Sequence, residues 1–185
     1  MLIARAAKNN NMIITTFTTK DFELVNSEYL RNSPRKRFDS NKDVDNHIAK
    51  VAGLCAEISI HKSIGLDWKF SFDSSDISIG GKEWQIKSRY ESGPGNPPKK
   101  TMFTISHKSD YSNIEGFIFS KVHINADMSG RVETYPHAYD RYYIEGNGHE
   151  FRTYGRMIKE NFLHGSVCDD KYRTDIREEL LITFQ

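Results

Sequence analysis

The sequence predicts an α/β protein in which a central mixed β-sheet is flanked by helices. Two observations predict this class: a long helical pattern over residues 41 to 65 precedes several strand patterns, and helical patterns return near the end of the chain. The length of 185 residues suits one domain, because single hydrophobic cores usually run to roughly 100–200 residues. Aromatic side chains make up 12% of the chain, which is enough to fill such a core and excludes general disorder.

The N-terminal third predicts a tail, a strand and two helices. Met12 opens a more ordinary sequence than the residues before it, so we expect residues 1 to 12 to form a flexible tail and residues 13 to 185 to form the domain. Residues 13 to 19 are Thr-rich and β-like, and DFELVNSEYL predicts a short helix with Asp21 as its N-cap. A longer helix begins at Asn41 and ends near Gly65, because apolar residues recur at steps of three and four: Val44, Ile48, Val51, Cys55 and Ile58.

The middle of the chain predicts strands. DWKFSFD alternates apolar and polar residues, which is typical of a strand. SDISI and KEWQIKS flank Gly80 and Gly81, so these segments predict a β-hairpin with a tight turn. Residues 92 to 98 contain three prolines and two glycines and predict a loop. MFTISH and GFIFSKVHI predict two more strands, and the second is expected at the centre of the sheet because Phe117, Ile118 and Phe119 are consecutively apolar.

The last third is less regular. The Tyr-rich residues 135 to 145 predict one or two strands, residues 156 to 163 predict a helix, and residues 174 to 181 predict a short closing helix.

No apolar run approaches the roughly 18 residues of a membrane helix, so we expect no membrane partner. The two cysteines form no CxxC pair, so a disulfide framework and a zinc ribbon are not indicated and a cytoplasmic location is expected.

Glu57 is an unusual residue of the long helix. The segment VAGLCAEISI is apolar or small on all sides, as expected of a helix covered on most faces, and Glu57 carries its only charge. A buried lone carboxylate costs several kcal/mol unless something compensates it. Glu57 either extends past the edge of the buried face or pairs with a lysine, or else it belongs to a functional site.

The predicted hairpin gathers polar side chains on one face. Side chains alternate along a strand, so Glu83, Gln85 and Lys87 share one side. Asp76 lies opposite Gln85 if Gly80 and Gly81 form the turn, and opposite Lys87 if the turn is displaced by one residue. In either register an acid, an amide and a lysine converge, close enough to share a divalent ion. The alternative is a cross-strand ion pair on a solvent-exposed face.

These features together resemble the PD-(D/E)XK nuclease superfamily. The matching pieces, in chain order, are Gly53-Leu-Cys-Ala-Glu57 on a helix, Ser75-Asp76-Ile77 on a strand and Gln85-Ile86-Lys87-Ser88 on the next strand. The resemblance covers residues 44 to 90, and the later strands extend it weakly. It implies a restriction-endonuclease-like core, which places a helix first and then three strands of a mixed sheet.

The resemblance also implies a role for each matched residue. Asp76 matches the metal-binding aspartate, Glu57 matches the helix acid that many members add to the metal site, and Lys87 matches the lysine that orients the attacking water and stabilises charge on the phosphate. Gln85 departs from the pattern, because Asp or Glu is commonest there. Its carbonyl can still ligate Mg²⁺, but the site loses one negative charge. The chain is therefore expected to be a Mg²⁺-dependent DNA endonuclease of a bacterial or phage-infected cell, with Mn²⁺ as a substitute.

A DNA partner must be bound by local charge, because the formal net charge is only +1. Residues 82 to 108 carry six basic residues against two acidic ones. The candidate DNA contacts in this region are Arg89, Lys99, Lys100 and Lys108. The basic cluster at 33 to 37 fits an ordinary solvated loop better. The small size and the lack of an obvious recognition domain suggest a homodimer, or a stand-alone nuclease of phage or mobile-element type.

Two other functions stay open. A nuclease-like fold with a weakened site would bind DNA or a protein without cutting, as in a module of phage or mobile-element origin, and Gln85 favours this alternative. An unrelated structural α+β protein would use Asp76, Gln85 and Lys87 as a surface network. Nicking, double-strand cleavage, junction resolution and single-strand digestion all use this core, and RNA remains a candidate substrate.

Overall fold

The computed structural model describes residues 12–33, 41–71, 75–95, 102–106, 111–147, 149–151, 155–159, 163 and 170–181. Several sequence predictions fall on other residues and lie outside the described part of the chain. They are the N-terminal tail before Met12, the basic cluster at 34 to 37, and the candidate DNA contacts Lys99, Lys100 and Lys108.

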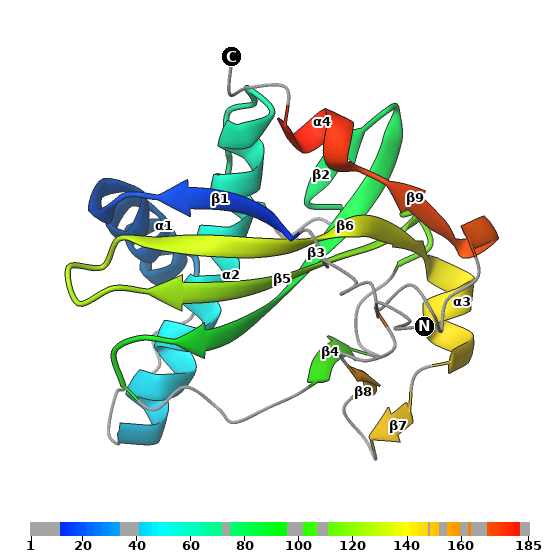
Figure 1. Cartoon of the computed structure of the whole chain (residues 1–185). Helices are drawn as coiled ribbons and strands as arrows, with labels where there is room; N and C mark the ends of the chain where they lie inside the picture. The colour runs from blue at the N-terminus through cyan, green and yellow to red at the C-terminus, as the bar shows by residue number, and fades with distance from the viewer. Residues whose placement is uncertain are drawn as a thin grey trace, which may run out of the picture.

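A central mixed sheet confirms the predicted α/β class (Figure 1). Its strands run in the order β1-β6-β5-β3-β2, and β9 pairs with the far part of β6. The pair β3 and β5 is parallel, and the other pairs are antiparallel. The strands are β1 (Ile13–Phe17), β2 (Ile77–Ile79), β3 (Lys82–Ser92), β5 (Gly116–Ile124), β6 (Gly130–Asp140) and β9 (Arg173–Asp175).

The two faces of this sheet carry different covers. Helix α2 (Asn41–Ser63) crosses one face, and α1 (Thr19–Asn32) and α4 (Arg177–Leu181) lie on the same side as parts of one apolar core. A second core on the other face is rich in aromatic residues and includes side chains of a small second sheet and of α3 (Arg141–Asn147). That small sheet has the order β4-β8-β7, with β4 (Met102–Ser106), β8 (Gly155–Lys159) and β7 (His149–Phe151).

Strand β5 joins the two cores, as predicted for a central strand. Phe117 and Phe119 point into the aromatic core, while Ile118 and Val122 point into the core beneath α2. Because successive side chains of a strand face opposite sides, a strand covered on both faces is apolar at consecutive positions. None of the described helices is long and apolar enough to cross a membrane.

The hairpin of β2 and β3 adopts the first of the two predicted registers. Gly80 and Gly81 form the turn with φ angles of 61° and 75°, which only glycine adopts without strain at both positions. Ile77 pairs with Trp84, so the next position outward places Asp76 beside Gln85. The Asp76 backbone N–H donates to the Trp84 carbonyl at 2.9 Å and continues this ladder by one residue.

Three sequence predictions are wrong. The N-cap of α1 is Thr18, and Asp21 is the third helical residue, whose carboxylate accepts the Thr18 backbone N–H in a capping box. Residues 155 to 159 form strand β8 rather than a helix, because this segment pairs with β4 on one side and with β7 on the other. Residues 67 to 71 form no strand, because Trp68 packs against the core beneath α2 and its ring meets Phe70 edge-on instead.

The C-terminal segment matches its prediction in part. The strand predicted within 135 to 145 begins earlier, as β6, and its last residues belong to α3. The closing helix is short and follows the 3₁₀ helix η2 (Asp170–Tyr172) and β9.

Candidate functional site

The first carboxylate of the candidate site is Glu57 of α2. Its neighbours Ala56 and Ile58 are buried in the core, while Glu57 itself is half-buried at the edge of this packed face. The indole N–H of Trp68 donates a hydrogen bond to Glu57 Oε2 at 3.3 Å. No lysine or arginine within the described ranges lies within ion-pair distance of Glu57, so the predicted alternative of a lysine partner is not seen there.

The second carboxylate is Asp76, directly before β2. Its Oδ2 accepts the backbone N–H of Ile86 at 2.7 Å and also a hydrogen bond from Nε2 of Gln85. Both bonds reach the same oxygen, and Oδ1 receives none from the residues that the structure covers. The hairpin register therefore fixes Asp76 against β3 and leaves one carboxylate oxygen available to a ligand.

The cation of the site is Lys87, which lies on the same face of β3 as Gln85 because side chains alternate along the strand. Its ammonium group lies 5.2 Å from the centre of the Tyr111 ring. The positive charge of Lys87 acts on both acids, and it lowers the pKa of Glu57 and the pKa of Asp76. The structure thus brings Glu57, Asp76, Gln85 and Lys87, all predicted from the sequence, to one place.

Burial destabilises the charged forms of both acids, and Asp76 further destabilises the charged form of Glu57. Burial raises the pKa of Glu57 well above its usual range, and repulsion from Asp76 raises it further against the opposing effects of Trp68 and Lys87. Burial also raises the pKa of Asp76, although the Ile86 N–H, Lys87 and Gln85 oppose the change. Two carboxyl groups that share a partly desolvated place attract protons or cations. The described protein groups therefore compensate the charges of two ionised acids only in part.

The donor set fits a hard divalent cation. No group of three or more His, Cys, Asp or Glu side chains that could hold a metal occurs among the residues that the structure describes. Mg²⁺ is usually bound through one or two carboxylates, with water and substrate phosphate as the other ligands. Glu57 and Asp76, with the Gln85 amide beside them, satisfy this requirement, and Mn²⁺ accepts the same oxygen ligands.

The other predicted contacts lie away from this cluster or outside the described residues. Arg89 is buried, with its guanidinium 2.7 Å from a carboxylate oxygen of Glu91 and 5.2 Å from the centre of the Phe103 ring. It therefore lies between the two sheets rather than on the surface that a DNA backbone would contact. Glu83 is exposed and accepts a hydrogen bond from Ser75.

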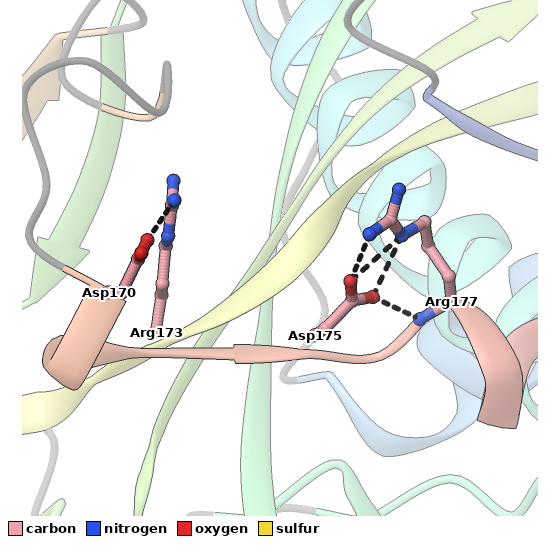
Figure 2. Close-up of polar contacts among 4 residues, drawn as sticks. All are labelled: Asp170, Arg173, Asp175 and Arg177. Atoms are coloured by element: carbon pink, nitrogen blue, oxygen red, sulfur yellow. Dashed lines mark hydrogen bonds and ion pairs between the residues drawn. The ribbon is translucent and has the colours of Figure 1, made fainter.

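Charged side chains near the C-terminus form a contrast to the candidate site (Figure 2). Arg173 pairs with Asp170, and Arg177 pairs with Asp175, each within a few residues along the chain. Both aspartates are exposed to solvent, Asp170 more than Asp175. Each of these four charges meets an opposite charge, so the two pairs offer no unbalanced cluster.

Sequence reasoning missed two aromatic residues of the site. Trp68 was assigned to a strand by its alternation with Phe70, and Tyr111 precedes β5 without any motif. One sequence feature could have indicated that Trp68 lies near Glu57. Trp68 follows soon after the end of α2, where the chain must turn back past Glu57. The Nδ1–H of His61, one turn after Glu57, donates to the Glu57 backbone carbonyl at 2.8 Å and not to its carboxylate. Comparisons with models of known families, with curated proteins and with solved structures found no significant match to this chain.

Proposed function

We propose that this chain is a Mg²⁺-dependent DNA endonuclease with a restriction-endonuclease-like core. The observation that carries the proposal is the meeting of Glu57, Asp76 and Lys87 from a helix and two hairpin strands. The charge of Lys87 lowers the pKa of both acids, and repulsion from Asp76 raises the pKa of Glu57. Two acids and one lysine in this arrangement suit phosphodiester hydrolysis, in which negative charge accumulates and must be neutralised.

Each residue has a distinct role in this proposal. Glu57 and Asp76 hold the cation, which when bound supplies a nucleophilic water and neutralises charge on the phosphate. Gln85 holds Asp76 in place through its hydrogen bond and lies where its amide can join the ligand set. Lys87 donates to a phosphate oxygen as negative charge develops there. Trp68 orients the Glu57 carboxyl group.

The proposed partner is DNA, bound by basic residues of the segment between β3 and β5. Lys99, Lys100 and Lys108 remain the proposed contacts to the phosphate backbone, whereas the buried Arg89 is no longer among them. We propose a homodimer, because a small chain gains specificity by presenting two sites to one duplex. A cytoplasmic location in a bacterial or phage-infected cell fits this activity.

A second candidate is a nuclease-like module that binds DNA or a protein without cutting. The observation that favours it is Gln85, because an amide stands where a third charged ligand would hold the cation more tightly. Such a module would bind nucleic acid with EDTA present and would never cut it.

The experiment that tests these functions incubates the purified protein with supercoiled plasmid and with denatured DNA, in Mg²⁺, Mn²⁺ or EDTA. We expect cleavage in either metal and none in EDTA. Asp76→Asn and Lys87→Gln should each lower the rate about 100-fold or more, the scale of losing one stabilising group at a developing charge. Asp76→Asn keeps an acceptor for the Ile86 N–H, so the hairpin should keep its fold.

Two control variants test whether a loss of cleavage is caused by the change at the site or by the change in the net charge of the protein. Asp67→Asn and Lys82→Gln change exposed residues of the same types, one before the hairpin and one on β3 itself. Both should cleave at the wild-type rate. Wild-type protein that binds DNA but leaves it intact in every metal supports the binding module, and protein that does neither contradicts the endonuclease and the DNA-binding form of the module.

A further inference from the structure

We infer that Tyr111 is a positioning residue, whose ring face holds the ammonium group of Lys87 at the place where a phosphate would be bound. This inference rests on the proposed nuclease function and adds to it a residue outside the four that the family resemblance implies. The contact joins two parts of the chain that the sequence gives no reason to connect, the motif strand β3 and the segment before β5.

The geometry of Lys87 is the first support. Its Nζ lies 5.2 Å from the centre of the Tyr111 ring, within the roughly 6 Å over which an aromatic face attracts a cation. Among the residues that the structure covers, Lys87 takes part in no ion pair within 4 Å and in no hydrogen bond. Within the described residues, the ring is therefore the group whose direct contact with this ammonium the structure shows.

The ring itself is firmly held. Tyr111 is 7% exposed, and its ring packs edge-on against Phe117 of β5, with the ring centres 5.2 Å apart. Its backbone carbonyl accepts a hydrogen bond from the Arg141 guanidinium and another from the Ile114 N–H. A lysine side chain has four rotatable bonds and much to lose on ordering, so a rigid neighbour is an effective way to restrict it.

The segment that carries Tyr111 is also tied to the motif strand. The Glu115 N–H donates to the Glu83 carbonyl of β3 at 2.8 Å, and the Arg141 N–H donates to the Glu115 carbonyl at 2.9 Å. These bonds link β3, the turn before β5 and the start of α3. The position of the ring relative to Lys87 is thus set by backbone contacts and not by the lysine alone.

An aromatic face suits a lysine that must meet a phosphate. A carboxylate partner would neutralise the ammonium and occupy its N–H donors, whereas a ring attracts the cation through its quadrupole and leaves donors for an anionic oxygen. The Tyr111 hydroxyl oxygen is buried without a hydrogen-bond partner in the described residues, so the ring and not the hydroxyl is the group that acts. Removing that hydroxyl should leave the fold intact, because an unsatisfied buried polar group does not stabilise it.

The variants that test the inference are Tyr111→Phe, which keeps the ring, and Tyr111→Leu, which removes it. Phe103→Leu is the matched control, because it removes a buried ring of the same core that lies beneath Arg89 instead of Lys87. Steady-state cleavage is measured in Mg²⁺ at a temperature at which all the variants are folded. We expect kcat to fall about 3- to 30-fold in Tyr111→Leu, the range that one cation–π contact supports, with KM unchanged. Tyr111→Phe and Phe103→Leu should keep the wild-type kcat.

A second measurement detects the contact without any activity. Lysines are dimethylated with ¹³C-formaldehyde, which keeps their charge, and the Lys87 resonance is identified by its loss in Lys87→Arg. We expect this resonance to be shifted upfield by the Tyr111 ring in wild type and in Tyr111→Phe, and to move to the ordinary lysine position in Tyr111→Leu.

The outcomes separate this inference from the proposed function. An unshifted Lys87 resonance in wild type overturns the inference whether or not the protein cuts DNA. A kcat that is unchanged in Tyr111→Leu, or equally reduced in Phe103→Leu, overturns it as well. A shifted resonance in a protein that cuts no nucleic acid overturns the proposed function and with it the positioning role, while the contact itself stands.

Discussion

Helix α2 carries two charged side chains little more than one turn apart, Glu57 and Lys62, and their surroundings are opposite. Lys62 meets the buried Asp21 of α1, with Nζ 2.5 Å from Oδ1. Burial raises the pKa of Asp21, but the hydrogen bonds from Lys62 and Thr18 outweigh this effect and lower it overall. Glu57 meets a second acid, Asp76, and its pKa is raised.

The comparison shows that the partners of a charged residue decide whether the cost of burying it is compensated. Asp21 and Glu57 both pay a desolvation cost. At Asp21 the cost is offset by a cation and by the capping box of α1, so the group holds two helices together. At Glu57 the nearby cation, Lys87, lies against a ring instead, and its charge offsets the burial of Glu57 and the repulsion from Asp76 only in part. A buried charged group whose desolvation cost is only partly offset, and whose pKa is therefore shifted, is characteristic of functional sites.

The largest effect on stability is expected from Asp21→Ala. This change removes the buried partner of Lys62 together with the hydrogen bonds that the Asp21 carboxylate accepts from Thr18, which should cost about 2–4 kcal/mol. For a chain of this length that corresponds to a fall in Tm of about 5–15 °C. Since the pKa of Asp21 is lowered by folding, its contribution is present above the unfolded pKa and is lost as pH falls through the folded pKa. Thermal unfolding should show a large difference in Tm between Asp21→Ala and wild type at pH 7 and a smaller difference at pH 3. A difference that is the same at both values contradicts the ion pair as its source.

Glu57→Gln should have a smaller effect of opposite sign, stabilising the metal-free protein by about 1–3 kcal/mol at pH 8.5. Burial raises the pKa of Glu57 from 4.5 to about 8, so the folded state binds the proton more tightly than the unfolded chain does. Wild type therefore loses stability as pH rises through this window, and the neutral glutamine does not. Urea unfolding in EDTA should show almost no difference at pH 4.5 and a growing difference towards pH 8.5. Glu23→Gln, an exposed control on α1, should show none at either value.

The sequence could predict the site better than it could predict the surroundings of the site. Glu57 stood out as the only charge in an apolar segment, and a Gly-Gly turn with strand alternation aligned Asp76 with Gln85. Both are local patterns with a fixed geometry. Asp21 was assigned as an N-cap, because its partner Lys62 lies in another helix and leaves no local signal. Trp68 and Tyr111 were missed for the same reason, since only tertiary packing brings them to Glu57 and Lys87.

Trp68→Phe should lower stability by about 1 kcal/mol, less than either change above, because it removes one hydrogen bond and keeps an aromatic ring. The indole N–H favours the charged form of Glu57, so its loss should raise the pKa of that group further. A double-mutant cycle with Glu57→Leu, which removes the acceptor of the indole N–H, isolates the contact by urea unfolding. Equal effects of Trp68→Phe in wild type and in Glu57→Leu at both pH 5 and pH 8.5 would show that the indole acts by packing alone.

The smallest effect is expected at the exposed pair of Figure 2, where Arg177→Gln should leave Tm unchanged within error. Arg177 donates from its guanidinium and its backbone N–H to Asp175, which lowers the pKa of Asp175. The side chains are 47% and 43% exposed, so water replaces the lost contacts and salt screens the attraction. Arg177 and Asp175 form as many hydrogen bonds with each other as Asp21 makes. They differ from Asp21 and Lys62 because both side chains are exposed to solvent and the two residues are close in sequence. A fall in Tm as large as that of Asp21→Ala would contradict this reasoning. It would mean that the number of contacts, rather than the burial of a charge against its partner, distinguishes the stabilising ion pairs of this protein from the candidate site at Glu57.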